Sequence, residues 1–279
     1  MLAYKGSSKK PASGYHFLTK GLMENYGLGY ATPLDINYMN RPELDHPDMI
    51  AAWPGMGYIA KISADYLRRR LNAKLFAEVT YFNNMLVYNN GVGDLSPIKH
   101  RFYAAPAKNL IICVGDAQPS IPEESVRLAE RVVDLAVSLG VRRMWTMAAY
   151  PSEYSDEPQV YGVYTSEEMR RSLEVQGIKI VQEEGVVNGL NGVVIGVAKF
   201  RGIPGACLMG DIKYANVPQH LSSRAVLIKL ASILNLELDT TLLEKRARRL
   251  DASIRKRLEV FEEETDLLPI SDKRPDYIS

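Results

Sequence analysis

Polar side chains follow several apolar runs that the sequence predicts to be strands, and their types suit hydrogen-bonding and acid–base chemistry. They are Asp116 and Gln118 after Gly115, Glu153 and Asp156 after Ala149, Asn188 and Asn191 in a glycine-rich loop, and Asp211 after Met209. In an open α/β sheet, such positions gather at the carboxyl edge of the strands, where ligands usually bind. The pattern therefore predicts a polar cleft at this edge. The alternative is that these residues only form turns and helix caps, where Asp and Asn are common.

Two glycine loops would bring backbone to the same edge. In the first, residues 185–192, Asn188 and Asn191 each precede a glycine, and the apolar run 193–198 that follows has the pattern of a helix. Asn and Gly tolerate a positive φ, and an Asn side-chain oxygen can cap a helix, so we predict that Asn191 caps this helix. The second loop, with Gly55 and Gly57, follows the apolar segment 49–53 and precedes an amphipathic stretch. We predict that both loops connect a strand to a helix.

The second loop also resembles a dinucleotide-binding fingerprint. Residues 55–60 fit G-x-G-x-x-G/A, and Glu78 lies near the expected acidic position. However, Pro54 removes a backbone N–H that could face a pyrophosphate, and the segments after Glu78 have the pattern of strands. We therefore favour a tight structural turn over a nucleotide site.

Other catalytic and metal-binding patterns do not emerge from the sequence. The four histidines have no neighbour at metal-ligand spacing (His16, His46, His100 and His220), and neither a G-x-S-x-G elbow nor a Walker loop occurs. Cys113 and Cys207 lie inside apolar runs, as buried free thiols do. We predict no catalytic residue, no metal and no cofactor.

The composition is that of an ordinary globular protein. The chain has 279 residues, is 46% hydrophobic, and has 34 basic against 33 acidic residues. This balance argues against a protein that coats nucleic acid or a membrane surface. The sequence has no apolar stretch of membrane-spanning length and no signal sequence, and free thiols fit a reducing compartment, so we expect a cytoplasmic protein.

Short apolar runs alternate with helical periods along the middle of the chain, which indicates an α/β fold with a mixed sheet covered on both faces. We expect strands at 74–80, 85–89 and 98–104, with Asn83 and Asn84 splitting the first pair and residues 91–94 forming a turn. We expect four regions: an irregular N-terminal wrap (1–47), an α/β/α core domain (48–239), a C-terminal amphipathic helix (240–264) and a flexible tail (265–279). The helix has one apolar residue per turn and an opposite face rich in Arg and Glu, so it either docks on its own domain or pairs with a second copy.

Four short motifs occur in order between residues 48 and 243. They are Pro54-Gly55-Met56-Gly57, Gly115-Asp116-Ala117-Gln118, the loop 185–192, and Arg201-Gly202-Ile203-Pro204-Gly205 leading into Cys207-Leu208-Met209-Gly210-Asp211. Together they resemble the proteasome assembly chaperone family of the second-chaperone type. The resemblance implies a three-layer α/β/α fold similar to purine nucleoside phosphorylases, homo-oligomers, and binding to proteasome α subunits. Archaeal and bacterial relatives have also been labelled ATP-grasp-like or carboxylate–amine ligases.

Some members of that family bind α subunits through a C-terminal hydrophobic-Tyr-X tail. This chain ends in Asp276, Tyr277, Ile278 and Ser279, so the tyrosine is third from last, and Asp276 stands where an apolar residue is wanted. Tyr277, Ile278 and Ser279 are therefore candidate partner-binding residues that depart from the pattern, and an incidental tyrosine in a flexible tail is the alternative.

These observations predict a non-catalytic assembly chaperone or scaffold that binds itself and proteasome α subunits. The alternative is an enzyme, ligase-like or phosphorylase-like, or another binder of a nucleotide or small molecule. It would use a cleft that includes Gly55, Gly57, Asp116, Gln118, Asn188, Asn191 and Asp211.

Overall fold

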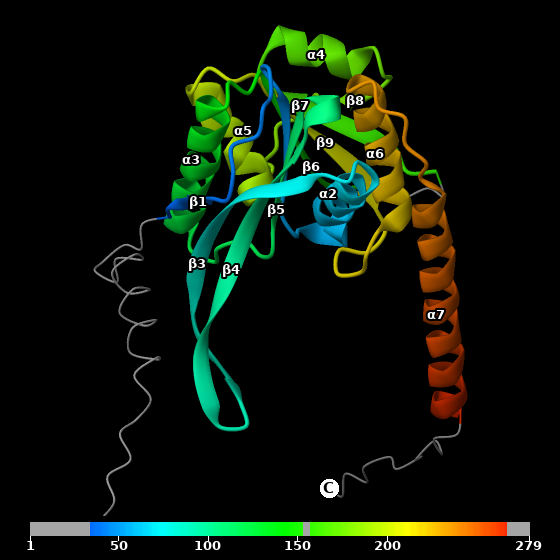
Figure 1. Ribbon diagram of the computed structural model, residues 1–279. Helices are drawn as coiled ribbons and strands as arrows, with labels where there is room; N and C mark the ends of the chain where they lie inside the picture. Colours follow the sequence, from blue (N-terminus) through cyan, green and yellow to red (C-terminus); the bar gives the residue numbers. More distant parts are fainter. Residues whose placement is uncertain (1–33, 153–156, 267–279) are drawn as a thin grey trace, which may run out of the picture.

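The structure is a computed structural model that describes residues 34–152 and 157–266, without the side chains of residues 83–85 and 258–266. Its centre is a nine-stranded mixed sheet in the order β1-β3-β4-β5-β2-β6-β9-β7-β8 (Figure 1). The strands are β1 (Ile36–Tyr38), β2 (Asp48–Ala52), β3 (Lys74–Asn89), β4 (Val92–Ala105), β5 (Leu110–Gly115), β6 (Arg143–Pro151), β7 (Val160–Tyr164), β8 (Lys179–Ile180) and β9 (Gly205–Ile212).

The middle of the sheet is parallel. Strands β5, β2, β6 and β9 run side by side in one direction, and β2, β5 and β9 are buried along their whole length. Strands buried on both faces appear in the sequence as continuous apolar runs, which is why these segments could be predicted. The two ends of the sheet are built differently, because β1, β3 and β4 pair antiparallel on one side and β7 pairs antiparallel with β9 on the other.

Helices cover both faces of this sheet. Helices α3 (Pro122–Ser138) and α5 (Leu190–Phe200) pack over one face, and α2 (Ile59–Arg70) and α6 (His220–Ile233) pack over the other (Figure 1). Helix α4 (Glu167–Glu174) packs against β7 and β8 at one end of the sheet. Two further elements, η1 (Met56–Tyr58) and η2 (Pro106–Lys108), are short 3-10 turns. The predicted α/β fold with a mixed sheet covered on both faces is confirmed, and Cys113 and Cys207 are buried free thiols as predicted.

The hairpin of β3 and β4 corrects two expectations. Asn83 and Asn84 do not split β3, because the strand continues past them through a register shift between Phe82 and Leu86. The turn is at Asn90 and Gly91, both with positive φ, so residues 92–94 begin β4 instead of forming the turn. Asn-Gly is a preferred two-residue hairpin turn for this reason. The hairpin extends beyond the body of the molecule (Figure 1).

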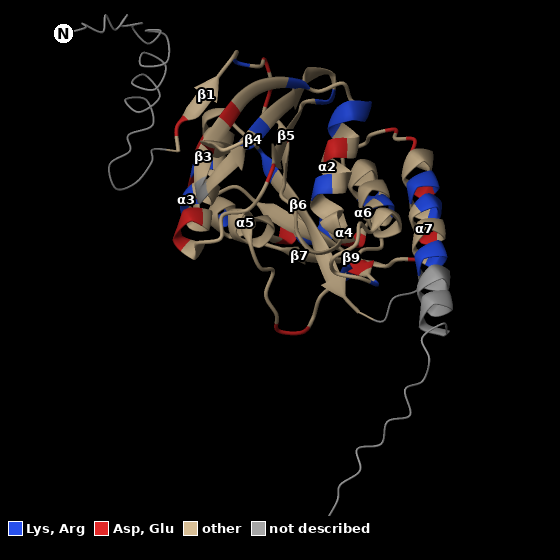
Figure 2. Cartoon of the chain, turned by 90° about the horizontal axis from the view of Figure 1, so that it is seen from below, with Lys and Arg blue, Asp and Glu red and all other residues tan. Residues whose placement is uncertain are grey.

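Helix α7 (Thr241–Asp266) follows α6 and extends from the same side of the body as the hairpin (Figure 1). Its first turns pack against its own domain, because Leu243 is buried in the core that α2 and α6 share and Ala247, one turn later, is also buried. Among its described side chains, at residues 241–257, seven are basic and two are acidic (Figure 2). None of the helices within the described part of the chain is long and apolar enough to cross a bilayer. The N-terminal residues 1–33 and the tail residues Tyr277, Ile278 and Ser279 lie outside the described residues.

Candidate functional site

A cleft of about 550 Å³ opens at the carboxyl edge of the parallel strands. It lies between the turn after β2, the ends of β6 and β9, and the loop 181–189 that leads into α5. Of the seven predicted cleft residues, four line it: Gly55, Gln118, Asn188 and Asn191. The other three, Gly57, Asp116 and Asp211, lie elsewhere.

Asn191 holds the turn after β2 against the start of α5. Its side-chain Oδ1 accepts a hydrogen bond from the backbone N–H of Trp53 at 3.0 Å, and its Nδ2 donates to the carbonyl oxygen of Trp53 at 3.2 Å. Asn191 is 4% exposed, so both bonds are shielded from water. The prediction that Asn191 caps the helix is wrong, because Gly189, with φ of 72°, occupies the N-cap position and α5 begins at Leu190.

Gln118 makes a second bridge between the same two segments. Its Nε2 donates a hydrogen bond to the carbonyl oxygen of Pro54, and its Oε1 accepts one from the backbone N–H of Leu190 at 2.7 Å. A side-chain amide has one acceptor oxygen and two donor hydrogens, so most of this capacity is used within the protein. Gln118 and Asn191 therefore fix the shape of the cleft.

Gly57 lies beside the cleft, in a closed backbone contact. It is buried and has φ of 63°, and its N–H donates to the carbonyl oxygen of Ala215 at 2.7 Å. Its own carbonyl oxygen accepts from the N–H of Gln219 at 2.8 Å. Because this N–H is already bonded, the loop has the character of the tight structural turn that the sequence favours over a phosphate cradle.

Asp211 is a buried structural carboxylate. One oxygen accepts a hydrogen bond from the hydroxyl of Ser152 at 2.7 Å, and the other accepts from the backbone N–H of Gln159 at 3.0 Å. Asp211 is 2% exposed. It ties the end of β9 to the chain between β6 and β7. The candidates Glu153 and Asp156 from the same region lie outside the described residues.

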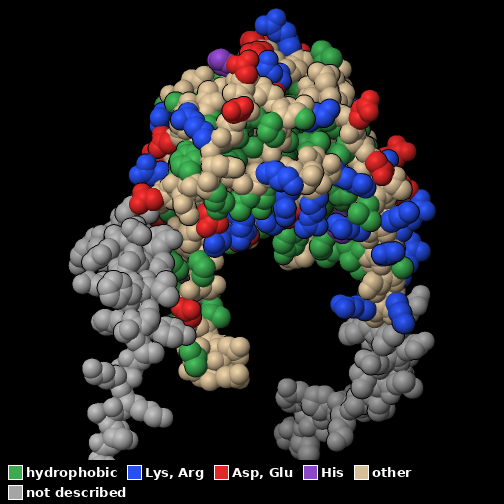
Figure 3. Space-filling model, in the orientation of Figure 1, with side chains coloured by type: hydrophobic (Ala, Val, Ile, Leu, Met, Phe, Trp, Pro, Cys, Tyr) green, Lys and Arg blue, Asp and Glu red, His purple; other side chains and the backbone are tan. Residues whose placement is uncertain are grey.

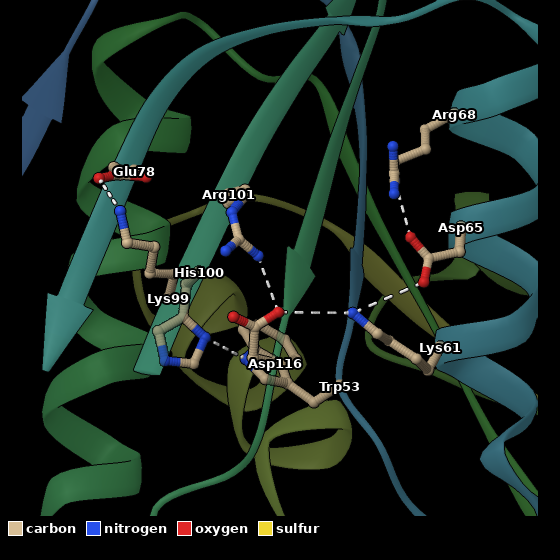
Figure 4. Close-up of polar contacts among 9 residues, drawn as sticks. All are labelled: Trp53, Lys61, Asp65, Arg68, Glu78, Lys99, His100, Arg101 and Asp116. Atoms are coloured by element: carbon tan, nitrogen blue, oxygen red, sulfur yellow. Dashed lines mark hydrogen bonds and ion pairs between the residues drawn. The ribbon is translucent and has the colours of Figure 1, made fainter. Parts of the chain in front are cut away.

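Asp116 does not line the cleft but belongs to a charged network between the sheet and α2 (Figure 4). Its carboxylate pairs with Arg101 at 2.8 Å and with Lys61 at 3.8 Å, and Lys61 also lies 3.6 Å from Asp65. Asp65 in turn accepts a hydrogen bond from Arg68 at 2.7 Å. Acids and bases alternate along this chain of contacts, so Asp116 is held between two cations.

A buried pair, Trp53 and His100, lies under this network (Figure 4). The indole N–H of Trp53 donates to Nδ1 of His100 at 2.8 Å, so the imidazole proton is on Nε2. Burial lowers the pKa of His100 to about 3, and the charges of Lys61 and Arg101 act in the same direction while Asp116 opposes them. His100 is therefore neutral at physiological pH and serves as a packed hydrogen-bond acceptor.

The sequence reasoning missed the walls of the cleft. They are mainly apolar, from Met56, Tyr150, Val163, Val187 and Met209, with Glu183 and Glu184 on the loop before α5. Met56 and Val187 lie in the two glycine loops that the sequence marks, but nothing in the types of these wall residues indicates that they line a cleft. The side chains of Glu183, Glu184 and Asn188 make no hydrogen bond or ion pair with any described residue, so they are free for a ligand, as is the hydroxyl of Tyr150. Within the described residues, no three His, Cys, Asp or Glu side chains come together as a metal site requires.

A mixed sheet covered by helices on both faces, with a cleft at the carboxyl edge of its parallel strands, defines a class of α/β proteins. Comparison with known proteins identifies the family. The model of the PAC2 family matches residues 49–258, and the chain belongs to this family. The resemblance to proteasome assembly chaperones is thereby confirmed at the level of the family.

Two solved structures and one relative illustrate the similarity. PbaB of Pyrococcus furiosus, described as an archaeal proteasome activator, is 28% identical with a TM-score of 0.70, over 80% of this chain and 97% of PbaB. PbaA of the same organism, described as an archaeal homologue of a proteasome-assembly chaperone, is 24% identical with a TM-score of 0.68, over 83% of this chain and 94% of PbaA. An uncharacterised protein of Methanocaldococcus jannaschii is 28% identical, over 79% of this chain and 86% of its own length. The label of ATP-grasp-like or carboxylate–amine ligase finds no support in these matches.

Proposed function

We propose that this protein is a non-catalytic assembly chaperone or scaffold that binds proteasome α subunits in the cytoplasm and works as a homo-oligomer. The match to PbaB carries the proposal, because it combines 28% identity with coverage of nearly the whole of a proteasome activator. The bonds of Asn191, Gln118 and Asp211 also support it. These side chains hold the protein's own loops, which is the role of structural residues.

The hairpin tip is the surface that we assign to a protein partner. It carries large apolar side chains that are 43–75% exposed: Leu86, Val87, Tyr88, Val92 and Leu95. Leu86 and Leu95 face each other across the hairpin, and Tyr88 lies two residues from Leu86 on the same face. Clustered exposed apolar side chains on a folded protein mark interaction sites. The C-terminal residues Tyr277, Ile278 and Ser279 remain a second proposed contact.

Binding to purified proteasome α subunits of the source organism tests this proposal, with biolayer interferometry as the measurement. The variant Tyr88→Ser/Leu95→Ser should weaken binding at least about tenfold, since each buried apolar side chain is worth more than 1 kcal/mol. The matched control is Val175→Ser/Phe200→Ser, which removes two exposed apolar side chains away from the hairpin. Equal binding by the two variants, or no binding by the native protein, would contradict the proposal.

The cleft supports a second candidate, the binding of a small molecule. Its volume of about 550 Å³ and its mainly apolar walls are typical of ligand pockets. The variant Asn188→Trp fills the cleft without removing a hydrogen bond to a described residue. If the chaperone proposal holds, this variant binds α subunits as the native protein does. If the cleft is the working site, native mass spectrometry finds a small bound molecule that Asn188→Trp lacks.

A further inference from the structure

A second cavity, of about 360 Å³, lies between α2, the start of α6 and the start of α7. Its charged lining is one-sided: four basic residues (Lys61, Arg69, Arg70 and Arg246) accompany a single acid, Asp65. Between these charges the walls are apolar or aromatic, from Ile62, Tyr58, Tyr66, Pro218 and Leu242. We call this cavity the basic groove. Lys and Arg side chains gather on this face, between the hairpin and α7 (Figure 3).

Two of the basic residues have no acidic partner. The side chains of Arg69 and Arg246 make no ion pair or hydrogen bond with any described residue. By contrast, Arg70 bonds to Tyr66 and Asp239, and Lys61 lies near Asp65 and Asp116. A further polar atom in the wall, Nδ1 of His220, is buried without a partner among the described residues. The groove thus offers unused positive charge beside apolar surface.

The chain itself contains a segment with the opposite character. In α7, residues 241–257 include seven basic and two acidic residues, whereas residues 258–266 include five acidic and no basic residues: Glu259, Glu262, Glu263, Glu264 and Asp266. The same nine residues include the apolar Leu258, Val260 and Phe261. An acidic segment with large apolar residues is the chemical complement of the basic groove.

This segment does not reach the groove of its own chain. Arg246 and Glu262 are 16 residues apart on one continuous helix, which is about 24 Å at 1.5 Å per residue. Because the helix continues to Asp266, it carries the acidic segment away from the body (Figure 1). A groove and a complementary segment that do not meet within one chain can meet between two.

We propose that the acidic segment 258–266 of one copy docks in the basic groove of a second copy, so that two copies exchange these segments around a two-fold axis. This inference rests on the self-association proposed above, but it does not rest on binding to proteasome subunits. It places the interface on α7 and α2 and leaves the hairpin tip free for another protein. Since exposed charges are screened by salt, the assembly should weaken as ionic strength rises.

Charge reversal on either side tests this inference in the full-length protein. The groove variant is Arg69→Glu/Arg246→Glu, and the segment variant is Glu262→Arg/Glu263→Arg. Each variant should raise the dissociation constant of the assembly about 100-fold. Two substitutions in each of two chains change roughly four contacts from attraction to repulsion, and each such change weakens binding about threefold. The control variant Arg127→Glu/Lys199→Glu makes the same change of charge as the groove variant, but on α3 and α5. Both side chains are exposed and have no partner among the described residues, so this variant should assemble as the native protein does.

Mixing the two reversed variants gives the decisive result. Each variant alone should be a monomer by light scattering coupled to gel filtration. Their equimolar mixture should form a heterodimer, because the unchanged acidic segment of the groove variant fits the unchanged basic groove of the segment variant. At the second contact, the introduced arginines 262 and 263 face the introduced glutamates 69 and 246, so attraction replaces the repulsion present in each variant alone. A native protein that is monomeric, or a mixture that stays monomeric while both variants fold by circular dichroism, would overturn the inference. Binding of α subunits, measured separately, distinguishes this failure from failure of the proposed function.

Discussion

Replacing Asn191 by Ala tests whether the polar residues at the cleft hold the protein together. The substitution leaves the backbone N–H and carbonyl of Trp53, now bonded at 3.0 and 3.2 Å, without partners in a buried place. Each unsatisfied buried group costs about 1–3 kcal/mol. We therefore expect the free energy of unfolding to fall by about 2–4 kcal/mol.

For a chain of this length, that loss corresponds to a decrease in Tm of roughly 3–7 °C. Thermal unfolding followed by circular dichroism measures it. Asn188→Ala is a matched control, because Asn188 lines the same cleft, is exposed, and makes no polar contact with a described residue. Its Tm should change by less than about 2 °C, as expected for surface substitutions. Equal Tm values for the two variants would refute the structural role of Asn191.

Three further predictions concern stability and its dependence on pH. First, His100 takes up a proton near pH 6.5 in the unfolded chain but only near pH 3 when it is buried. The free energy of unfolding should therefore decrease as the pH falls between these values, and the slope should be up to about 1.4 kcal/mol per pH unit steeper than in His100→Gln. Second, Asp48→Asn should destabilise the protein by about 2–4 kcal/mol at pH 7, because Arg143 loses two charged hydrogen bonds of 2.7 and 2.9 Å. Third, Gly57→Ala should cost about 2–4 kcal/mol, because φ is 63° and the new Cβ would lie 2.7 Å from Cγ of Gln219.

Urea denaturation across a pH series checks the first two of these predictions. Burial raises the pKa of Asp48, but hydrogen bonds and charges from Arg143 and Arg142 outweigh it, so the pKa lies below 3.8. The stabilisation by Asp48 is therefore complete above about pH 4 and is lost as the pH falls through the lowered pKa. Native protein and Asp48→Asn should become more similar in strong acid, and a constant difference would contradict this assignment. For Gly57→Ala, unchanged Tm would show that the turn is not constrained.

The fold could be predicted because its centre has a simple signature. Strands such as Leu110–Gly115 are buried on both sides and appear as continuous apolar runs, and the helix that begins at Pro122 carries proline and acids in its first turn. The β3–β4 hairpin was harder. Asn and Gly are typical of turns, yet Asn83 and Asn84 lie within a strand at a register shift, and only Asn90 and Gly91 turn the chain.

The location of the cleft could be predicted from the sequence, but the roles of its polar residues could not. Polar residues after parallel strands reach one edge of the sheet, and four of the seven chosen residues line the cleft there. Their roles depend on partners far away in sequence: Asn191 bonds to Trp53, 138 residues earlier, and Gln118 to Leu190, 72 residues later. Residue types and spacing do not reveal such pairings. The division of α7 into a basic first part and an acidic last part is local, and it is visible directly in the sequence.

Native mass spectrometry of the full-length protein mixed with proteasome α subunits decides between a chaperone and a small-molecule binder. A chaperone gives a complex whose mass equals a whole number of copies of this chain plus α subunits, and the same complex forms with Asn188→Trp. A spectrum with no mixed complex, in which this chain instead carries a nucleotide-sized molecule that Asn188→Trp loses, would contradict the chaperone proposal and assign the function to the cleft.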